Sequence, residues 1–276
     1  MRIRGSVAVV TGASSGVGRA VALALARQGA AVALVARRGQ ELEKVAKEIG
    51  QLGGRAVVLQ CDVADPEAVE RTAEEARRAL GRIDILINAA GLAIWRPFAA
   101  ITDEEHRAMM AVNYWGTFHW IRAVLPAMRE SRRGAIVNLV AGSGKFALAV
   151  TSGFSASKFA VAGLGEALRR ELLGSGVTVS SIFPGSVRTA FWDERNIDFA
   201  ELPPLVRFSP KLSPAAVARQ VIWATRLGLA ERTLPVFVAF TARLNALWTR
   251  LGDLLLWRWF VPATLGVLAL RYLVAR

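Results

Sequence analysis

The chain has 276 residues, 53% of them hydrophobic, which suits one large core and predicts one α/β domain with a tail. Its net charge of +13 comes from basic residues that match no zinc-finger, RNP or groove-reading pattern, so nucleic acid is excluded as the expected partner. The single cysteine, Cys61, excludes an intrachain disulfide and has no metal-ligand spacing around it, which indicates a reducing compartment and no metal site.

The first predicted element is a strand at residues 7–10, followed by a glycine-rich turn at residues 11–18 and a helix at residues 19–28. Glycine lets the backbone adopt positive φ and approach a phosphate closely, and the first N–H groups of the helix attract the anion. A tight turn without a ligand has a similar composition. The position between a strand and a helix favours a dinucleotide site instead.

Six further apolar runs follow, and segments with helical periodicity separate them. Continuous apolar runs are typical of strands buried on both faces, as in a parallel sheet between two layers of helices. We therefore predict a doubly wound, Rossmann-like α/β fold, in which ligands bind beyond the carboxyl ends of the strands. The further predicted strands are residues 31–35, 56–59, 83–87, 135–139, 177–183 and 236–238.

Residues 191–212 interrupt this pattern, because they contain Pro203, Pro204 and Pro210 and show little periodicity. We predict a long loop that covers the substrate site. The nucleotide-binding domain should then comprise residues 1–240, with a hydrophobic and basic tail over residues 241–276.

Polar and glycine residues follow several predicted strands, at the edge where ligands bind. They are Asp62, Asn88-Ala89-Ala90-Gly91 and Pro184-Gly185-Ser186-Val187-Arg188-Thr189, and the chain adds Asn113 and a helix start, Ser155-Ala156-Ser157-Lys158. Together with the opening turn, these motifs resemble the short-chain dehydrogenase/reductase family over about residues 7–238. The resemblance implies an oxidoreductase that moves hydride to or from C4 of a nicotinamide.

The resemblance also implies a cofactor site built from the strand ends. On the pyrophosphate and adenosine side, it implies Gly12, Ser14, Ser15, Gly16, Val17, Gly18, Asp62 and Val63. Around the central ribose and the nicotinamide, it implies Asn88, Ala89, Gly91, Lys158, Pro184, Gly185, Val187 and Thr189.

The residues at the end of the second predicted strand indicate which cofactor binds. The chain has Arg37 and Arg38 there and no acidic residue. A carboxylate there would accept from a ribose 2′-hydroxyl and repel a 2′-phosphate. Two guanidinium groups instead favour NADP(H) over NAD(H), because they fork onto phosphate oxygens. The alternative is a solvated pair of arginines on a loop.

Two hydroxyl groups that the resemblance implies for catalysis are absent. Phe154 stands at the family's tyrosine position, four residues before Lys158, and Ala141 stands at the position of the substrate-binding serine. Asn113 and Lys158 remain from the catalytic set, and Ser143 is a candidate substitute donor, although an ordinary loop hydroxyl has the same pattern. General acid–base assistance contributes about 10²–10⁴-fold to the reaction rate, so its loss determines whether the chain is an active enzyme.

Three accounts of the reaction stay open. The chain transfers hydride through an atypical proton path that uses Lys158, water and Ser143; or it binds NADP(H) without turnover and acts through partners; or a tyrosine has been replaced in an ordinary enzyme. The absence of the serine argues against the third account, because one substitution explains only half of the loss. We expect an oxidoreductase with an atypical site, with the cofactor-binding pseudoenzyme as the alternative.

The predicted substrate pocket is apolar, which indicates a lipophilic carbonyl or alcohol. Core packing would account for the same aromatic residues. The candidates on loops after the strands are Ile94, Trp95, Phe98, Phe146, Leu148, Phe191 and Trp192.

The tail combines Trp248, Trp257 and Trp259 with leucines and arginines, and its longest uncharged stretch, residues 259–270, is shorter than a membrane span. This composition suits a segment at a membrane interface. The alternative is packing on a neighbouring subunit, since the resemblance implies a homo-oligomer. No cleavable apolar segment precedes the first strand, so we expect a cytoplasmic protein that contacts the inner face of a membrane.

Overall fold

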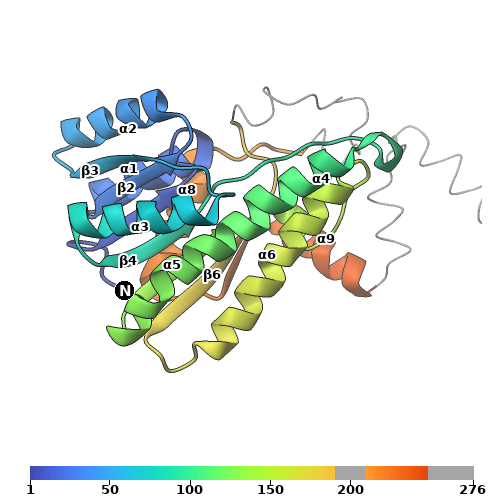
Figure 1. Cartoon of the computed structure of the whole chain (residues 1–276). Coiled ribbons are helices and arrows are strands. Elements are labelled where there is room, and N and C mark those ends of the chain that lie inside the picture. The colour runs from blue at the N-terminus through green and yellow to red at the C-terminus, as the bar shows by residue number, and fades with distance from the viewer. Residues whose placement is uncertain (190–208, 248–276) are drawn as a thin grey trace, which may run out of the picture.

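The computed structural model describes residues 1–189 and 209–247, so most of the predicted loop at 191–212 and of the predicted tail lies outside the described residues. Seven strands form one parallel sheet in the order β3-β2-β1-β4-β5-β6-β7 (Figure 1). The predicted doubly wound α/β fold is confirmed. The strands are β1 (Val7–Thr11), β2 (Ala31–Ala36), β3 (Ala56–Gln60), β4 (Ile83–Asn88), β5 (Gly134–Leu139), β6 (Val177–Pro184) and β7 (Glu231–Leu234).

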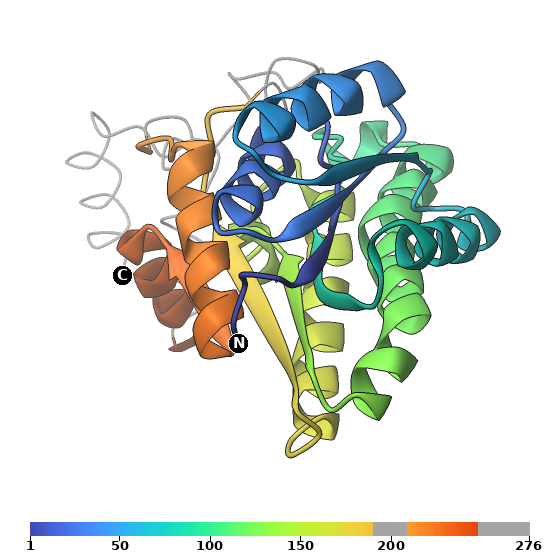
Figure 2. The same cartoon turned by 90° about the vertical axis from the view of Figure 1, so that its left-hand side faces the viewer.

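Helices cover both faces of the sheet (Figure 2). Alternate residues of β1 face opposite layers: Ala8 and Val10 belong to one buried cluster, and Val7 and Val9 to another. Strands buried in this way need apolar residues on both faces, which explains their continuous apolar runs. The first cluster includes α1 (Gly16–Arg27), α2 (Gly39–Gln51) and α8 (Pro214–Leu227), and the second includes α3 (Pro66–Leu80), α5 (Gly116–Glu130) and α6 (Ser152–Glu171).

The order of the strands reverses beside β1, and this reversal places the site. On one side β1 pairs with β2, where Val10 lies opposite Leu34, and on the other it pairs with β4, where Val10 lies opposite Ile87. The connections from β1 and β4 therefore leave the same edge of the sheet as neighbours. Such a switch point is where doubly wound sheets bind ligands.

Side-chain caps stand at the start of three helices. Asp65 accepts hydrogen bonds from the Glu67 and Ala68 amides ahead of α3, and Ser213 caps α8 in the same manner. Thr102 and Glu105 form a reciprocal capping box at α4 (Asp103–Met110). These side chains satisfy amide groups that the first helical turn leaves without partners.

The helix that carries Asn113 contains an irregular turn. Regular α4 continues through a π-helical turn, Ala111–Trp115, into α5. A π turn widens the helix by one residue and often occurs at functional sites. Here the turn contains Asn113, which is buried.

The prediction of a strand at residues 236–238 is wrong. These residues begin a helix, α9 (Val236–Leu247), and the seventh strand is β7, which precedes Pro235. Proline lacks an amide hydrogen and ends the strand, and the short β-branched run after it resembles a strand only in composition. Helix α9 also continues past the expected domain boundary at residue 240. Within the described residues, no helix is both long and apolar enough to cross a membrane.

We expect Ile87→Ala to lower the free energy of unfolding by about 2–5 kcal/mol, because Ile87 is fully buried in the central strand β4 and its loss leaves a cavity. Leu173→Ala is the matched control, since Leu173 is 74% exposed and should change stability by less than about 0.5 kcal/mol. Denaturant unfolding measures both. Equal losses in the two variants would contradict this placement of the core.

Candidate active site

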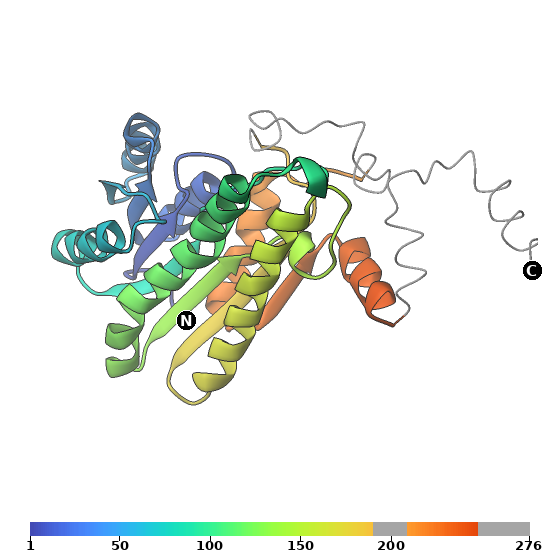
Figure 3. The same cartoon turned by 45° about the vertical axis from the view of Figure 1, so that its right-hand side comes forward.

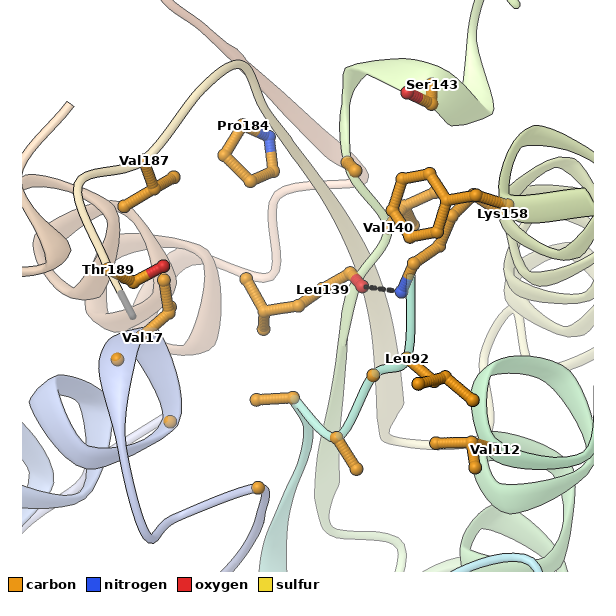
Figure 4. Close-up of a pocket in the computed structure, with 18 of the residues that line it drawn as sticks. Val17, Leu92, Val112, Leu139, Val140, Ser143, Lys158, Pro184, Val187 and Thr189 are labelled. Atoms are coloured by element: carbon orange, nitrogen blue, oxygen red, sulfur yellow. Dashed lines mark hydrogen bonds between the residues drawn. The ribbon is translucent and has the colours of Figure 1, made fainter. Parts of the chain in front are cut away.

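A cavity of about 420 Å³ lies at the carboxyl edge of the sheet (Figure 4). In Figure 4, Val17, Val187 and Thr189 stand on one side of it, while Lys158 and Leu92 stand on the other. The structure thus brings together most of the residues predicted for the cofactor. Those that line the cavity are Gly12, Ser14, Ser15, Gly16, Val17, Gly18, Arg37, Arg38, Asp62, Val63, Ala89, Gly91, Lys158, Pro184, Gly185, Val187 and Thr189.

The glycine turn after β1 fits closely against its neighbours. Gly12 has φ of +65°, and a Cβ there would lie 2.8 Å from the carbonyl oxygen of Ala89, while a Cβ on Gly18 would collide with the carbonyl oxygen of Gly12. Helix α1 begins at Gly16, earlier than the predicted residue 19. Side chains are therefore kept out of the space where the first turn of α1 meets the cavity, as close approach of a pyrophosphate requires.

Basic side chains stand at the end of the cavity nearest β2, where the resemblance implies the adenosine. The guanidinium of Arg38 donates to the hydroxyl oxygens of Ser15 at 2.8 Å and Ser14 at 3.3 Å. Arg37 lies 4.0 Å from the Asp62 carboxylate, and both side chains are well exposed. Two guanidinium groups and two hydroxyl groups thus surround the end of β2, a set of donors that suits a phosphate monoester.

Asn88 does not line the cavity, although the resemblance implied a contact with the cofactor. Its amide nitrogen donates to the Oδ1 of Asn138 at 2.9 Å, and the two buried side chains join the ends of β4 and β5. Beside them, the hydroxyl oxygen of Thr11 accepts from the amides of Ala89 and Ala90. The positioning roles of Asn138 and Thr11 were not predicted from the sequence. The signal that could have indicated them is that each is a polar residue at the end of an apolar strand.

Asn113 is fully buried and does not line the cavity. Its hydrogen bonds instead fix the shape of the site. Its Oδ1 accepts from the Leu92 amide at 2.8 Å, and its Nδ2 donates to the Leu92 carbonyl at 2.9 Å and to the Ser157 hydroxyl at 2.8 Å. These bonds tie the loop after β4 to α6. A Cβ on Gly91 in that loop would lie 3.4 Å from Asn113 Oδ1 and 3.7 Å from Lys158 Nζ.

Lys158 is buried and points into the cavity (Figure 4). Its Nζ donates to the carbonyl oxygen of Leu139 at 3.1 Å and lies 5.8 Å from the centre of the Phe154 ring. Burial lowers the pKa of this amine from 10.5 to about 8. Lys158 therefore holds a proton near neutral pH and releases it more readily than an exposed lysine.

Apolar groups stand where the resemblance implies two hydroxyl groups. Phe154 is 4% exposed and packs on Trp95, with ring centres 6.1 Å apart, and Ala141 belongs to the same apolar cluster. Ala141 has φ of +104°, a conformation that alanine seldom adopts and that is costly unless its surroundings impose it. The backbone of this strand end is thus held in an unusual shape beside Lys158.

Two further polar side chains, Ser143 and His119, lie in different positions relative to the cavity. Ser143 lines the cavity from a 3₁₀ turn, Gly142–Gly144, that follows β5, so it remains a candidate donor to substrate. His119 lies on α5, stacks on Trp115 with ring centres 5.9 Å apart, and does not line the cavity. Burial lowers the pKa of His119, which fits a packing residue.

The side of the cavity around Lys158 and Phe154 is mostly apolar. Trp95, Phe146 and Leu148 line it as predicted. Ile94 and Phe98 do not, and Phe98 is 79% exposed, so the loop after β4 presents Trp95 alone of these three; Phe191 and Trp192 lie outside the described residues. Sequence reasoning missed Phe237 and Val238, because it placed them in a strand instead of on α9.

Comparison with known proteins identifies the family. The family model of the short chain dehydrogenases matches residues 6–199, which include the glycine turn, Asn88, Asn113 and Lys158. This chain belongs to the short-chain dehydrogenase family, and its relatives are named as dehydrogenases and oxidoreductases.

Individual relatives support the same family. The chain is 37% identical over 222 residues to a D-threitol dehydrogenase of Mycolicibacterium smegmatis, covering 79% of this chain and 85% of the relative. It is 38% identical over 234 residues to an uncharacterized oxidoreductase of Staphylococcus saprophyticus, covering 81% and 92%. A solved structure of an alcohol dehydrogenase from the archaeon Thermococcus sibiricus, complexed with 5-hydroxy-NADP, has a TM-score of 0.72 at 27% identity and covers 83% of this chain and 94% of that one.

We expect Lys158→Met to raise the free energy of unfolding at pH 7 by roughly 1–3 kcal/mol, because the folded state pays a desolvation cost for the buried ammonium that the unfolded state does not. The pKa is lower in the folded than in the unfolded chain, so this cost is complete below pH 8 and disappears between pH 8 and 10.5. The gain should shrink over that interval.

Denaturant unfolding at several pH values measures the gain. Lys44→Met is the control, because Lys44 is exposed and pairs with Glu41 on the surface of α2. A stability change for Lys158→Met that stays constant from pH 7 to pH 10.5 would show that the amine is not desolvated.

Proposed function

We propose that this chain is an NADP(H)-dependent oxidoreductase for a lipophilic carbonyl or alcohol, in which Lys158 rather than a tyrosine handles the proton. The observation that carries the proposal is the position of Lys158, a buried amine at the cavity with an apolar phenyl ring beside it. Among the described residues that line the cavity, the other titratable groups are Arg37, Arg38, Cys61 and Asp62, and they lie at its adenosine end.

The preference for NADP(H) rests on the end of β2. No acidic residue stands there to accept from a ribose 2′-hydroxyl, and Arg37 and Arg38 are both at the cavity. Arg38 donates to the hydroxyl groups of Ser14 and Ser15, so its guanidinium lies over the glycine turn. A 2′-phosphate bound there would accept hydrogen bonds from the same guanidinium and hydroxyl groups. The structural relative was solved with an NADP derivative, which is consistent with this choice.

The glycine turn and the loop after β6 would hold the cofactor, with Val187 and Thr189 on the nicotinamide side. When bound, the nicotinamide supplies or accepts the hydride. In the direction of reduction, Lys158 Nζ gives its proton to the substrate oxygen as the carbon accepts the hydride, and the resulting amine regains a proton from water. In oxidation the same amine removes the hydroxyl proton. The Leu139 carbonyl orients Nζ for either step.

The proposed substrate class follows from the wall around Lys158. Trp95, Phe146, Leu148 and Phe154 offer aromatic and aliphatic surface, and the polar groups beside them are the Lys158 amine and the Ser143 hydroxyl. Such a wall favours a ligand with one oxygen atom on an otherwise hydrocarbon body. A polyol would leave most of its hydroxyl groups without partners at this wall.

We expect Arg38→Ala to raise the Kd for NADPH by about 10- to 100-fold while it leaves the Kd for NADH nearly unchanged, because the lost hydrogen bonds to a charged group are worth about 1.5–3 kcal/mol. Titration of intrinsic tryptophan fluorescence with each cofactor measures the two constants. Arg19→Ala is the control, because Arg19 follows the same turn but pairs with Glu48. Equal weakening of NADPH and NADH by Arg38→Ala would contradict a 2′-phosphate site.

We expect kcat for reduction of a lipophilic ketone by NADPH to fall as the pH rises through about 8, because only the protonated amine of Lys158 can donate. Phe154→Tyr should raise kcat by about 10²-fold or more, because a phenol beside Lys158 adds a second proton donor.

Steady-state rates over a pH series test both statements. Phe159→Tyr is the matched control, since Phe159 is the exposed aromatic residue next to Lys158 on α6 and its phenol would lie away from the cavity. Tight NADPH binding with no product from the unchanged chain, and product only from Phe154→Tyr, would refute an active lysine site.

A further inference from the structure

Helix α9 has two apolar faces that meet different surroundings. One face includes Val238, which packs against Phe146 in the wall of the cavity, and Phe237 lines the same cavity. The opposite face exposes Val236, Phe240 and Leu247, which are 83%, 65% and 86% exposed. Figure 3 shows α9 at the outer edge of the fold, beyond β7. Apolar residues on both sides of a helix indicate that both sides are covered, one by the fold and the other by a further surface.

The exposed residues form one continuous stripe. At about 100° per residue, positions 236, 240 and 247 fall within about 40° of one another around the helix. Arg243 falls on the same stripe and is exposed, and residues 236–247 include no aspartate or glutamate. The stripe, defined as Val236, Phe240, Arg243 and Leu247, therefore combines apolar and cationic groups.

We propose that this stripe docks on the surface of an anionic phospholipid bilayer and so places the apolar end of the cavity against the membrane. Large apolar side chains enter the boundary between headgroups and acyl chains, and an arginine among them pairs with lipid phosphate. The chain that follows α9, residues 248–276, has three tryptophans, four arginines and one aspartate, a composition suited to the same surface.

The consequence for substrate follows from the two faces of α9. Phe237 and Val238 contact the cavity from the same helix whose outer face would lie on lipid, so a lipophilic substrate dissolved in the bilayer would have a short path to the apolar wall. This consequence rests on the proposed function. The docking itself does not, since it is measured without turnover.

A fluorescent probe on the stripe tests the docking in the full chain. An environment-sensitive fluorophore is attached to Phe240→Cys in a Cys61→Ser background, and a control chain has the fluorophore at Leu173→Cys, an exposed apolar position beyond the end of α6. Vesicles of phosphatidylcholine with phosphatidylglycerol should shift the emission at position 240 to the blue. Phosphatidylcholine alone should shift it much less, and the control probe should not respond.

A vesicle flotation assay supplies the second readout. Phe240→Ser should lower the partition coefficient roughly tenfold, the loss expected for one large apolar side chain, and Leu173→Ser should leave it unchanged. Reduction of a short, water-soluble ketone by Phe240→Ser, measured without vesicles, separates a failure of docking from a failure of the proposed activity.

Three outcomes would overturn the proposal. The chain does not float with anionic vesicles; or it floats while the probe at position 240 stays unchanged, which assigns the contact to residues 248–276 alone; or the probe shifts with protein concentration in the absence of vesicles, which assigns the stripe to a second copy of the chain.

Discussion

The close approach of the β1 turn to the end of β4 is the constraint on which the site depends. Gly12 and Gly18 have no room for a Cβ, because the carbonyl oxygens of Ala89 and Gly12 occupy the positions that it would need. The Thr11 hydroxyl fixes the same junction by accepting from two amides of the β4 loop. The cavity at the switch point of the sheet follows from this junction, because it sets how near α1 and the β4 loop lie.

The two halves of the cavity differ in chemistry. Hydroxyl and guanidinium groups gather at the end nearest β2, whereas Phe154, Trp95 and Ala141 form an apolar cluster beside Lys158 at the other end. Burial raises the cost of holding a charge at this end of the cavity and so lowers the pKa of Lys158. The amine therefore gives up its proton more easily than an exposed lysine does.

The sheet and the strand-end loops were predictable from the sequence, because buried parallel strands need apolar residues on both faces and ligands gather at their carboxyl ends. The role of Asn88 was not predictable from the sequence, because its hydrogen bond to Asn138 depends on the register between β4 and β5. Residues 236–238 were wrongly predicted as a strand because three β-branched or aromatic residues are compatible with a strand or with a helix. Whether Pro235 ends a strand or precedes one depends on the surrounding structure. The π turn at Asn113 has no signal in local sequence periodicity.

The central claim is that the unchanged chain transfers hydride without the family's tyrosine. Single-turnover incubation with NADPH deuterated at C4 and a lipophilic ketone tests it most directly, with mass spectrometry of the extracted alcohol. The account predicts deuterium on the carbinol carbon, transferred from one face of the nicotinamide only. Recovery of unlabelled ketone together with intact, enzyme-bound deuterated NADPH would contradict it.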